Sequence, residues 1–112
     1  SVLNQCTYCI DHHTYAGGLA YAGKPEAWSA IADALMGDRL EEVFDGKELA
    51  LLGYVRALTL APAALTVESI ETLRAAGASD GEILEVNQVT GYFAYANRVV
   101  LGLGVTLDGE TR

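Results

Sequence analysis

The stretch that decides the fold is residues 79–103, SDGEILEVNQVTGYFAYANRVVLGL. It opens on Ser79 with Glu82 three residues later, the capping-box pattern that marks the start of a helix. After this box, apolar side chains recur at intervals of three and four residues, which is the spacing of one helix face. We therefore predict a long helix over residues 80–103. The apolar ridge consists of Val86, Val89, Phe93, Ala96, Val100 and Leu103.

A second apolar ridge, Tyr92, Tyr95 and Val99, runs beside the first on the same predicted helix. A helix with two apolar ridges needs more than one neighbouring surface. A chain of 112 residues buries only about 60 to 65% of its unfolded surface. We therefore expect a homo-oligomer in which another copy covers the second ridge. The alternative is that the two tyrosines are half-exposed in a monomer.

The residues before this stretch also show helical patterns, and we predict helices over residues 4–22, 25–36, 46–60 and 66–76. Their predicted starts carry capping residues and their predicted ends carry breakers. The capping residues are Asn4, Asp45 and Thr66, and the breakers are Gly23, Gly37, Pro62 and Gly77. Gly17 and Gly18 inside the first helix indicate close packing against another helix. Only residues 105–107 resemble a strand, so the predicted class is all-α with about five helices.

The composition indicates one helical domain spanning residues 1–112, because 51% of the residues are hydrophobic. The net charge of −8 argues against nucleic acid or an anionic membrane surface as a partner. The chain has no run of 18 apolar residues, so we expect no membrane span, and no signal peptide is visible. Two cysteines at CxxC spacing fit a reducing compartment, so we expect a cytoplasmic protein.

Residues 6–13, CTYCIDHH, contain both cysteines and both histidines of the chain. In a helix, Cys6, Cys9 and His13 would lie at i, i+3 and i+7 and share one face. With Asn4 as the N-cap, both cysteines would lie near the helix start, where free N–H groups and the helix dipole stabilise a thiolate. A neutral His13 could accept the proton of Cys9. This pattern predicts a redox-active dithiol; His12 points away and has a packing or solvent role.

Three other interpretations of the cysteines stay open. A structural disulfide across CxxC closes a short loop and stabilises little. A zinc site is disfavoured because four ligands within eight residues of one helix cannot surround a tetrahedral ion. The third alternative is two buried, inert thiols. We expect no metal ion.

The spacing of Asn4, Cys6, Tyr8, Cys9 and His13 resembles the cysteine signature of the alkylhydroperoxidase D-like proteins of the carboxymuconolactone decarboxylase superfamily. Some members of this family have histidine in place of Tyr8. Residues 50–107 are similar to the peroxidase-related members, so the resemblance covers nearly the whole chain. That part of the resemblance rests on LRAAG at residues 73–77, SDGEILEV at residues 79–86 and the pair Asn97-Arg98.

The resemblance implies an orthogonal helical bundle that assembles as trimers or hexamers. It also implies a thiol-dependent peroxidase or disulfide oxidoreductase without metal, haem or flavin. Cys9 would attack a hydroperoxide, Cys6 would form the disulfide, His13 would shuttle the proton, and an external dithiol or thiol protein would restore the thiols. The reverse roles of the cysteines stay open, because Cys6 lies nearer the helix start. Family members also have a relay glutamate on a preceding helix; that position falls before Ser1, so we expect this chain to lack the helix.

Two alternative functions remain. The first is a decarboxylase or lactone-processing enzyme of the same superfamily that does not use the thiols. The second is a non-enzymatic protein, either an oligomeric helical scaffold or a redox sensor with a switchable disulfide. Peroxide turnover separates the leading hypothesis from both.

Overall fold

The structure, a computed structural model, describes residues 1–110, and these residues form α-helices and short 3₁₀ turns without any strand. The all-α prediction with about five helices is confirmed. Residues 105–107 are not a strand. The helices are α1 (Thr7–Ala20), α2 (Pro25–Met36), α3 (Gly46–Leu60), α4 (Val67–Ala75) and α5 (Asp80–Gly102), with 3₁₀ turns at Leu40–Glu42 and Pro62–Ala64.

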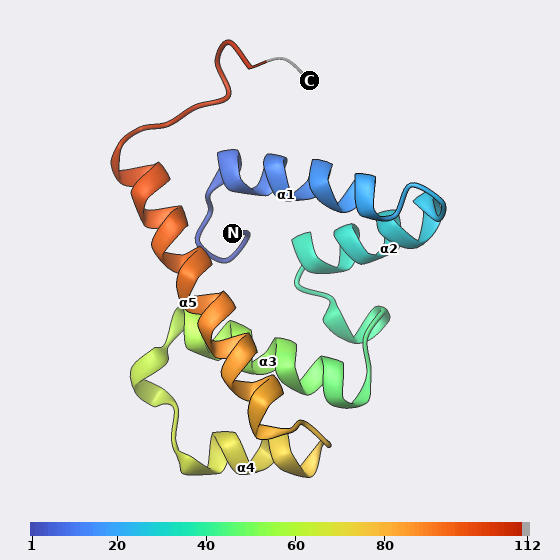
Figure 1. Cartoon of the computed structure of the whole chain (residues 1–112), viewed down its shortest axis with the longest axis vertical. Coiled ribbons are helices and arrows are strands. Elements are labelled where there is room, and N and C mark those ends of the chain that lie inside the picture. The colour runs from blue at the N-terminus through green and yellow to red at the C-terminus, as the bar shows by residue number, and fades with distance from the viewer. Residues whose placement is uncertain (111–112) are drawn as a thin grey trace.

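The long helix α5 connects two groups of helices (Figure 1). It contacts α3 and α4 near its start and α1 nearer its end, while α1 and α2 pair with each other. The Cα radius of gyration is 15.2 Å, against about 13 Å for a compact domain of roughly this length. The two groups are therefore held together by α5 and do not close into one dense core.

The apolar core lies where α3, α4 and α5 meet. Its buried members are Tyr54, Leu73, Ala78 and Ile83. The buried Tyr54 keeps a polar partner, because Asn87 Nδ2 donates a hydrogen bond to its hydroxyl at 2.8 Å. This cluster anchors the start of α5.

Capping fixes the start of α5 as the sequence predicts. Ser79 Oγ accepts a hydrogen bond from the Glu82 amide, and Glu82 Oε1 accepts one from the Ser79 amide, both at 3.1 Å. Lys47 from α3 lies 2.8 Å from Glu82. Hydrogen bonds to the carboxylate from Lys47 and from the Ser79 amide and hydroxyl hold the pKa of Glu82 at about 2, so this carboxylate is ionised at neutral pH. Just before the box, Gly77 has φ +97°, the left-handed conformation that ends α4.

The helices α1 and α2 pack closely because of Gly17. A Cβ at this position would lie 2.1 Å from a ring carbon of Trp28. Tyr21, which follows α1, stacks on the same indole with a centroid distance of 5.6 Å. The predicted packing role of Gly17 is confirmed.

The predicted bounds of the first helix are wrong at both ends. The helix begins at Thr7, and Cys6 is the N-cap with extended backbone angles. Asn4 does not cap it, because its side chain donates a hydrogen bond to Asn97 on α5. At the other end α1 stops at Ala20, so Gly23 is not its terminator.

Candidate functional site

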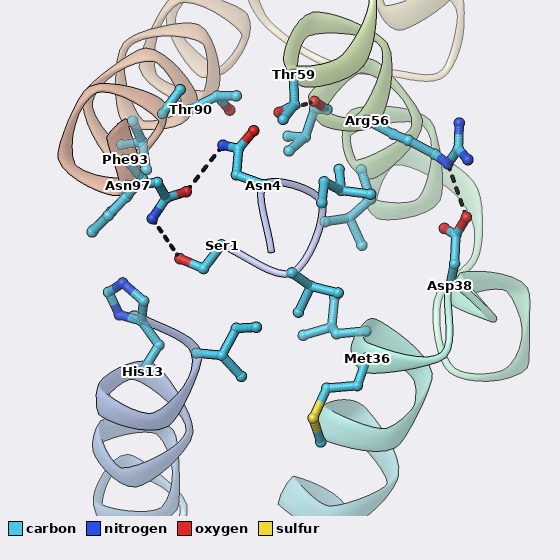
Figure 2. Close-up of a pocket in the computed structure, with 18 of the residues that line it drawn as sticks. Ser1, Asn4, His13, Met36, Asp38, Arg56, Thr59, Thr90, Phe93 and Asn97 are labelled. Atoms are coloured by element: carbon cyan, nitrogen blue, oxygen red, sulfur yellow. Dashed lines mark hydrogen bonds and ion pairs between the residues drawn. The ribbon is translucent and has the colours of Figure 1, made fainter. Parts of the chain in front are cut away.

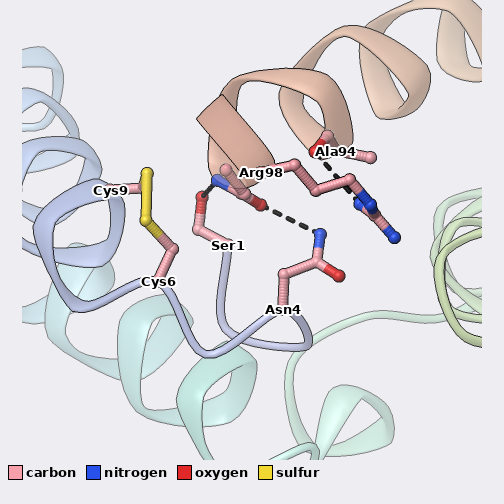
Figure 3. The surroundings of a disulfide bond; sticks show 7 residues. Ser1, Asn4, Cys6, Cys9, Ala94 and Arg98 are labelled. Atoms are coloured by element: carbon pink, nitrogen blue, oxygen red, sulfur yellow. Dashed lines mark hydrogen bonds between the residues drawn. A yellow bond between two sulfur atoms is a disulfide. The ribbon is translucent and has the colours of Figure 1, made fainter. Parts of the chain in front are cut away.

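Cys6 and Cys9 form a disulfide at the start of α1 (Figure 3). Cys6 is the N-cap residue, and Cys9 is the third residue of the helix. Their Cα atoms are 5.3 Å apart. Cys6 has no exposed surface and Cys9 is 7% exposed. The bond is therefore covered by protein, and Cys9 is the cysteine nearer to solvent.

A buried amide on α5 holds the segment that leads into Cys6. Asn97 is fully buried, and both ends of its side chain are satisfied. Its Nδ2 donates to Ser1 Oγ at 3.1 Å, and its Oδ1 accepts from Asn4 Nδ2 at 3.0 Å. The Cys6 amide in turn donates to the Ser1 carbonyl at 3.2 Å. Asn97, whose bonds to Ser1 and Asn4 are drawn in Figure 2, thus fixes the backbone that positions the disulfide.

His13 lies one helical turn after Cys9, as the sequence predicts, but it is more exposed to solvent than Cys9. Cys9 is buried whereas His13 is exposed, and the imidazole edge contacts the ring of Phe93 on α5 at a centroid distance of 4.8 Å. Desolvation lowers the pKa of His13, and the positive charges of the chain's amino terminus and of His12 lower it further. The ring is therefore neutral at neutral pH and can accept a proton.

His12 points to a different neighbour, the segment after α5. Its Nε2 lies 2.9 Å from Glu110 Oε2, and its ring packs against that of Tyr8 in a tilted arrangement, with the ring centroids 4.3 Å apart. Nε2 is buried without an aligned hydrogen bond, so the contact with Glu110 is an ion pair only when His12 is protonated. The sequence predicts a packing or solvent role for His12, but no sequence signal pairs it with a residue 98 positions away.

A cavity of about 560 Å³ lies beside the disulfide helix, enclosed by residues of α1, α2, α3, α5 and the segment before Cys6. His13 lines it, as do Asn4 and Asn97, but neither cysteine does (Figure 2). The cysteines and His13 are thus close along α1 without opening into one common cavity. Sequence patterns do not reveal this cavity, because its walls come from segments far apart in the chain.

Within residues 1–110, no three His, Cys, Asp or Glu side chains are grouped so that they could hold a metal ion. In the same residues, no helix combines the length and apolar character needed to cross a membrane. Comparison of the chain with protein-family models, with curated proteins and with solved structures finds no match. Membership of the alkylhydroperoxidase D-like family therefore stays a prediction from the cysteine and C-terminal motifs.

Proposed function

We propose that this chain is a thiol-dependent peroxidase or disulfide oxidoreductase of the alkylhydroperoxidase D-like type. The observation that carries the proposal is the disulfide between Cys6 and Cys9 at the start of α1, with His13 one turn further on. In this proposal the bond between Cys6 and Cys9 is the oxidised half of a dithiol cycle and not a purely structural disulfide. Its position at a helix start favours the thiolate form of the reduced half.

In the proposed cycle, Cys9 of the reduced protein is the nucleophile. His13 accepts the Cys9 proton, and the thiolate attacks the terminal oxygen of a hydroperoxide. The O–O bond breaks, and the alkoxide leaves as an alcohol with the proton from His13. Cys9 is then a sulfenic acid. Its formation oxidises the sulfur by two electrons and reduces the peroxide by two.

The second half of the cycle forms and removes the disulfide. The Cys6 thiol attacks the Cys9 sulfur, the S–O bond breaks, and water leaves. An external dithiol, small or carried by a protein, then reduces the disulfide by exchange and is itself oxidised. The balance is one hydroperoxide and one dithiol converted to one alcohol, one water and one disulfide.

Burial of the two cysteines supports the assignment of Cys9 as the reacting residue. Cys6 has no exposed surface, whereas Cys9 retains 7%. An incoming peroxide or thiol therefore meets Cys9 first. Because even Cys9 is nearly covered, a bulky reductant has to open the first turn of α1 before exchange.

The same burial favours a second candidate, a redox switch that is oxidised and reduced without catalytic turnover. A covered disulfide exchanges slowly with thiols in solution. In that case oxidation would change the fixed segment before α1 instead of consuming peroxide. Turnover distinguishes a switch from an enzyme.

We also propose that the protein assembles as a homo-oligomer, a trimer or hexamer by resemblance. The supporting observation is the exposure of the second ridge of α5, where Tyr92 is 62%, Tyr95 67% and Val99 39% exposed. Covering such apolar surface favours association. Sedimentation of the intact chain at micromolar concentration tests this, and a monomer would contradict it.

The decisive experiment for the enzyme is peroxide consumption by the reduced protein with a dithiol donor. We expect Cys9→Ser to abolish turnover and disulfide formation. Cys6→Ser should allow about one turnover and then stall. A wild-type protein that forms the disulfide but shows no turnover would favour the switch. Full activity in both serine variants would rule out thiol chemistry and would favour the decarboxylase-like alternative.

A further inference from the structure

The cavity beside α1 has the size and lining of a small-molecule site. Its volume of about 560 Å³ lies within the range of roughly 300 to 1,000 Å³ that ligand pockets occupy. It is bordered by α1 and α2 on one side and by α3 and α5 on the other. Figure 2 shows the labelled side chains of these elements facing a common space.

The walls are apolar because most polar side chains on them are already engaged. Thr14, Thr59 and Thr90 each donate a hydrogen bond to the carbonyl four residues earlier in their own helix, at 2.7, 2.8 and 2.7 Å. The Asn97 amide is bonded to Asn4 and Ser1. The remaining wall is largely aliphatic or aromatic, including Leu35, Leu52, Val55, Val86 and Phe93.

The charged side chains of the lining do not favour an anion. Within residues 1–110, Arg56 is the only cationic side chain among them, and its Nε lies 2.9 Å from Asp38 Oδ2, which neutralises it. Glu85 adds a negative charge near the start of α5. In the part of the chain that the structure describes, a carboxylate or sulfonate on a ligand would therefore find no unpaired cationic side chain on the lining. The remaining cation is the α-amino group of Ser1, and desolvation lowers its pKa and so disfavours its charged form.

His13 is a polar side chain of the lining that can meet a ligand, as are the indole N–H of Trp28 and the carboxylate of Glu85. The imidazole of His13 contacts the ring of Phe93 and makes no hydrogen bond within residues 1–110. Figure 2 shows the imidazole at the edge of the cavity, on the side of Phe93 and Asn97. An imidazole in this place offers one donor or acceptor to a molecule inside the cavity.

We propose that the cavity binds an uncharged, largely apolar small molecule whose single hydrogen-bonding group meets His13. This inference goes beyond the proposed thiol function, because neither cysteine lines the cavity and binding requires no redox step. An occupant would lie one helical turn from Cys9.

Two fluorescent probes with the same ring skeleton test the charge requirement. N-phenylnaphthylamine is uncharged, and anilinonaphthalenesulfonate carries a sulfonate. We expect the intact chain to bind the uncharged probe saturably and at least about tenfold more tightly than the sulfonate, a difference of about 1.4 kcal/mol. Equal or tighter binding of the sulfonate would overturn the proposal.

Variants then locate the probe. Val89→Trp and Ala94→Phe add bulk to the α5 wall of the cavity, at a half-exposed and at a partly buried lining residue. We expect each to weaken binding of the uncharged probe about tenfold or more, a readout set by the loss of cavity volume. The matched control is Val67→Trp, at an exposed valine outside the cavity. If both filled variants bind the probe as the control does, the cavity is not the site.

Displacement of the probe tests the role of His13. A primary alkanol and its methyl ether have the same chain, but only the alkanol donates a hydrogen bond. In His13→Ala the alkanol should displace the probe about fivefold less well, the value of one hydrogen bond. An unaffected ether would show that the ligand donates this bond to the imidazole, and an equal loss for the ether would show that the ligand accepts it. If the alkanol displaces the probe from His13→Ala as well as from the wild type, the proposed contact with His13 is wrong. Probe binding is measured with the oxidised protein without peroxide or dithiol, so the outcome does not depend on the thiol chemistry.

Discussion

The two ends of the molecule are stabilised in different ways. The α3–α4–α5 corner has a buried apolar cluster around Leu73 and a complete capping box at Ser79. The buried apolar side chains of the α1–α2 end are all small, namely Cys6, Cys9, Ala32 and Ala34. This end is held by a disulfide, by the Asn97 hydrogen bonds and by the contact of Gly17 with Trp28. The comparison suggests that the corner supplies stability while the other end, beside the cavity, is free to carry chemistry.

The largest effect should come from truncating the core of the corner. Leu73 is 2% exposed, so Leu73→Ala should lower the free energy of unfolding by about 2 to 5 kcal/mol. Leu35→Ala on the cavity wall should cost less, about 2 kcal/mol or below, because Leu35 is only partly buried. Urea unfolding measures both. Equal losses would show that the two ends are equally well packed.

At the α1–α2 end, the contact between Gly17 and Trp28 can be tested with a single methyl group. Gly17→Ala would push into the indole, so we expect a loss of about 1 to 3 kcal/mol. The matched control is Gly53→Ala in α3, where a Cβ meets nothing within 4 Å and helix propensity favours alanine by about 1 kcal/mol. The midpoint temperature of thermal unfolding should fall for Gly17→Ala and rise for Gly53→Ala. A stabilised Gly17→Ala protein would refute the tight packing.

The Asn97 hydrogen bonds should affect both stability and redox behaviour. Asn97→Ala leaves the Asn4 amide and the Ser1 hydroxyl without their partner, so the protein should lose about 1 to 3 kcal/mol. The segment before Cys6 should also loosen, and dithiothreitol should reduce the disulfide faster. Asn87→Ala, which removes the bond to Tyr54 in the corner, is the control. Asn87→Ala should destabilise the protein, but dithiothreitol should reduce its disulfide no faster than in the wild type. Both variants are compared under conditions where each is fully folded.

These two ends also differ in how well their structure can be predicted from sequence. The start of α5 follows from Ser79 and Glu82, and the end of α4 from Gly77, because the bonds that fix them are local. The start of α1 does not follow, because Asn4 bonds to Asn97, 93 residues away. For the same reason the spacing of Cys6, Cys9 and His13 is predictable, but their burial and the adjacent cavity are not.

The smallest effect concerns pH. Desolvation lowers the pKa of His13 below its ordinary value of 6.5, so the unfolded chain binds more protons than the native one as the pH falls through that value. Stability should therefore decrease slightly below about pH 6.5. His13→Ala should lack this contribution. If peroxide is turned over, the rate should also fall at acid pH as the imidazole becomes protonated, and denaturant titrations and rates across pH 5 to 8 check both.

The most direct measurement of the central claim is to trap the first product of peroxide attack. The reduced Cys6→Ser protein is treated with one equivalent of hydroperoxide and then with dimedone, and the adduct is located by mass spectrometry. The proposed cycle predicts a sulfenic acid adduct on Cys9, formed on the order of 10² to 10⁴ times more slowly when His13 is alanine. Labelling of Cys6 in the Cys9→Ser protein, with no adduct on Cys9 in the Cys6→Ser protein, would reverse the roles. The absence of an adduct on either cysteine would contradict peroxidase chemistry at this disulfide.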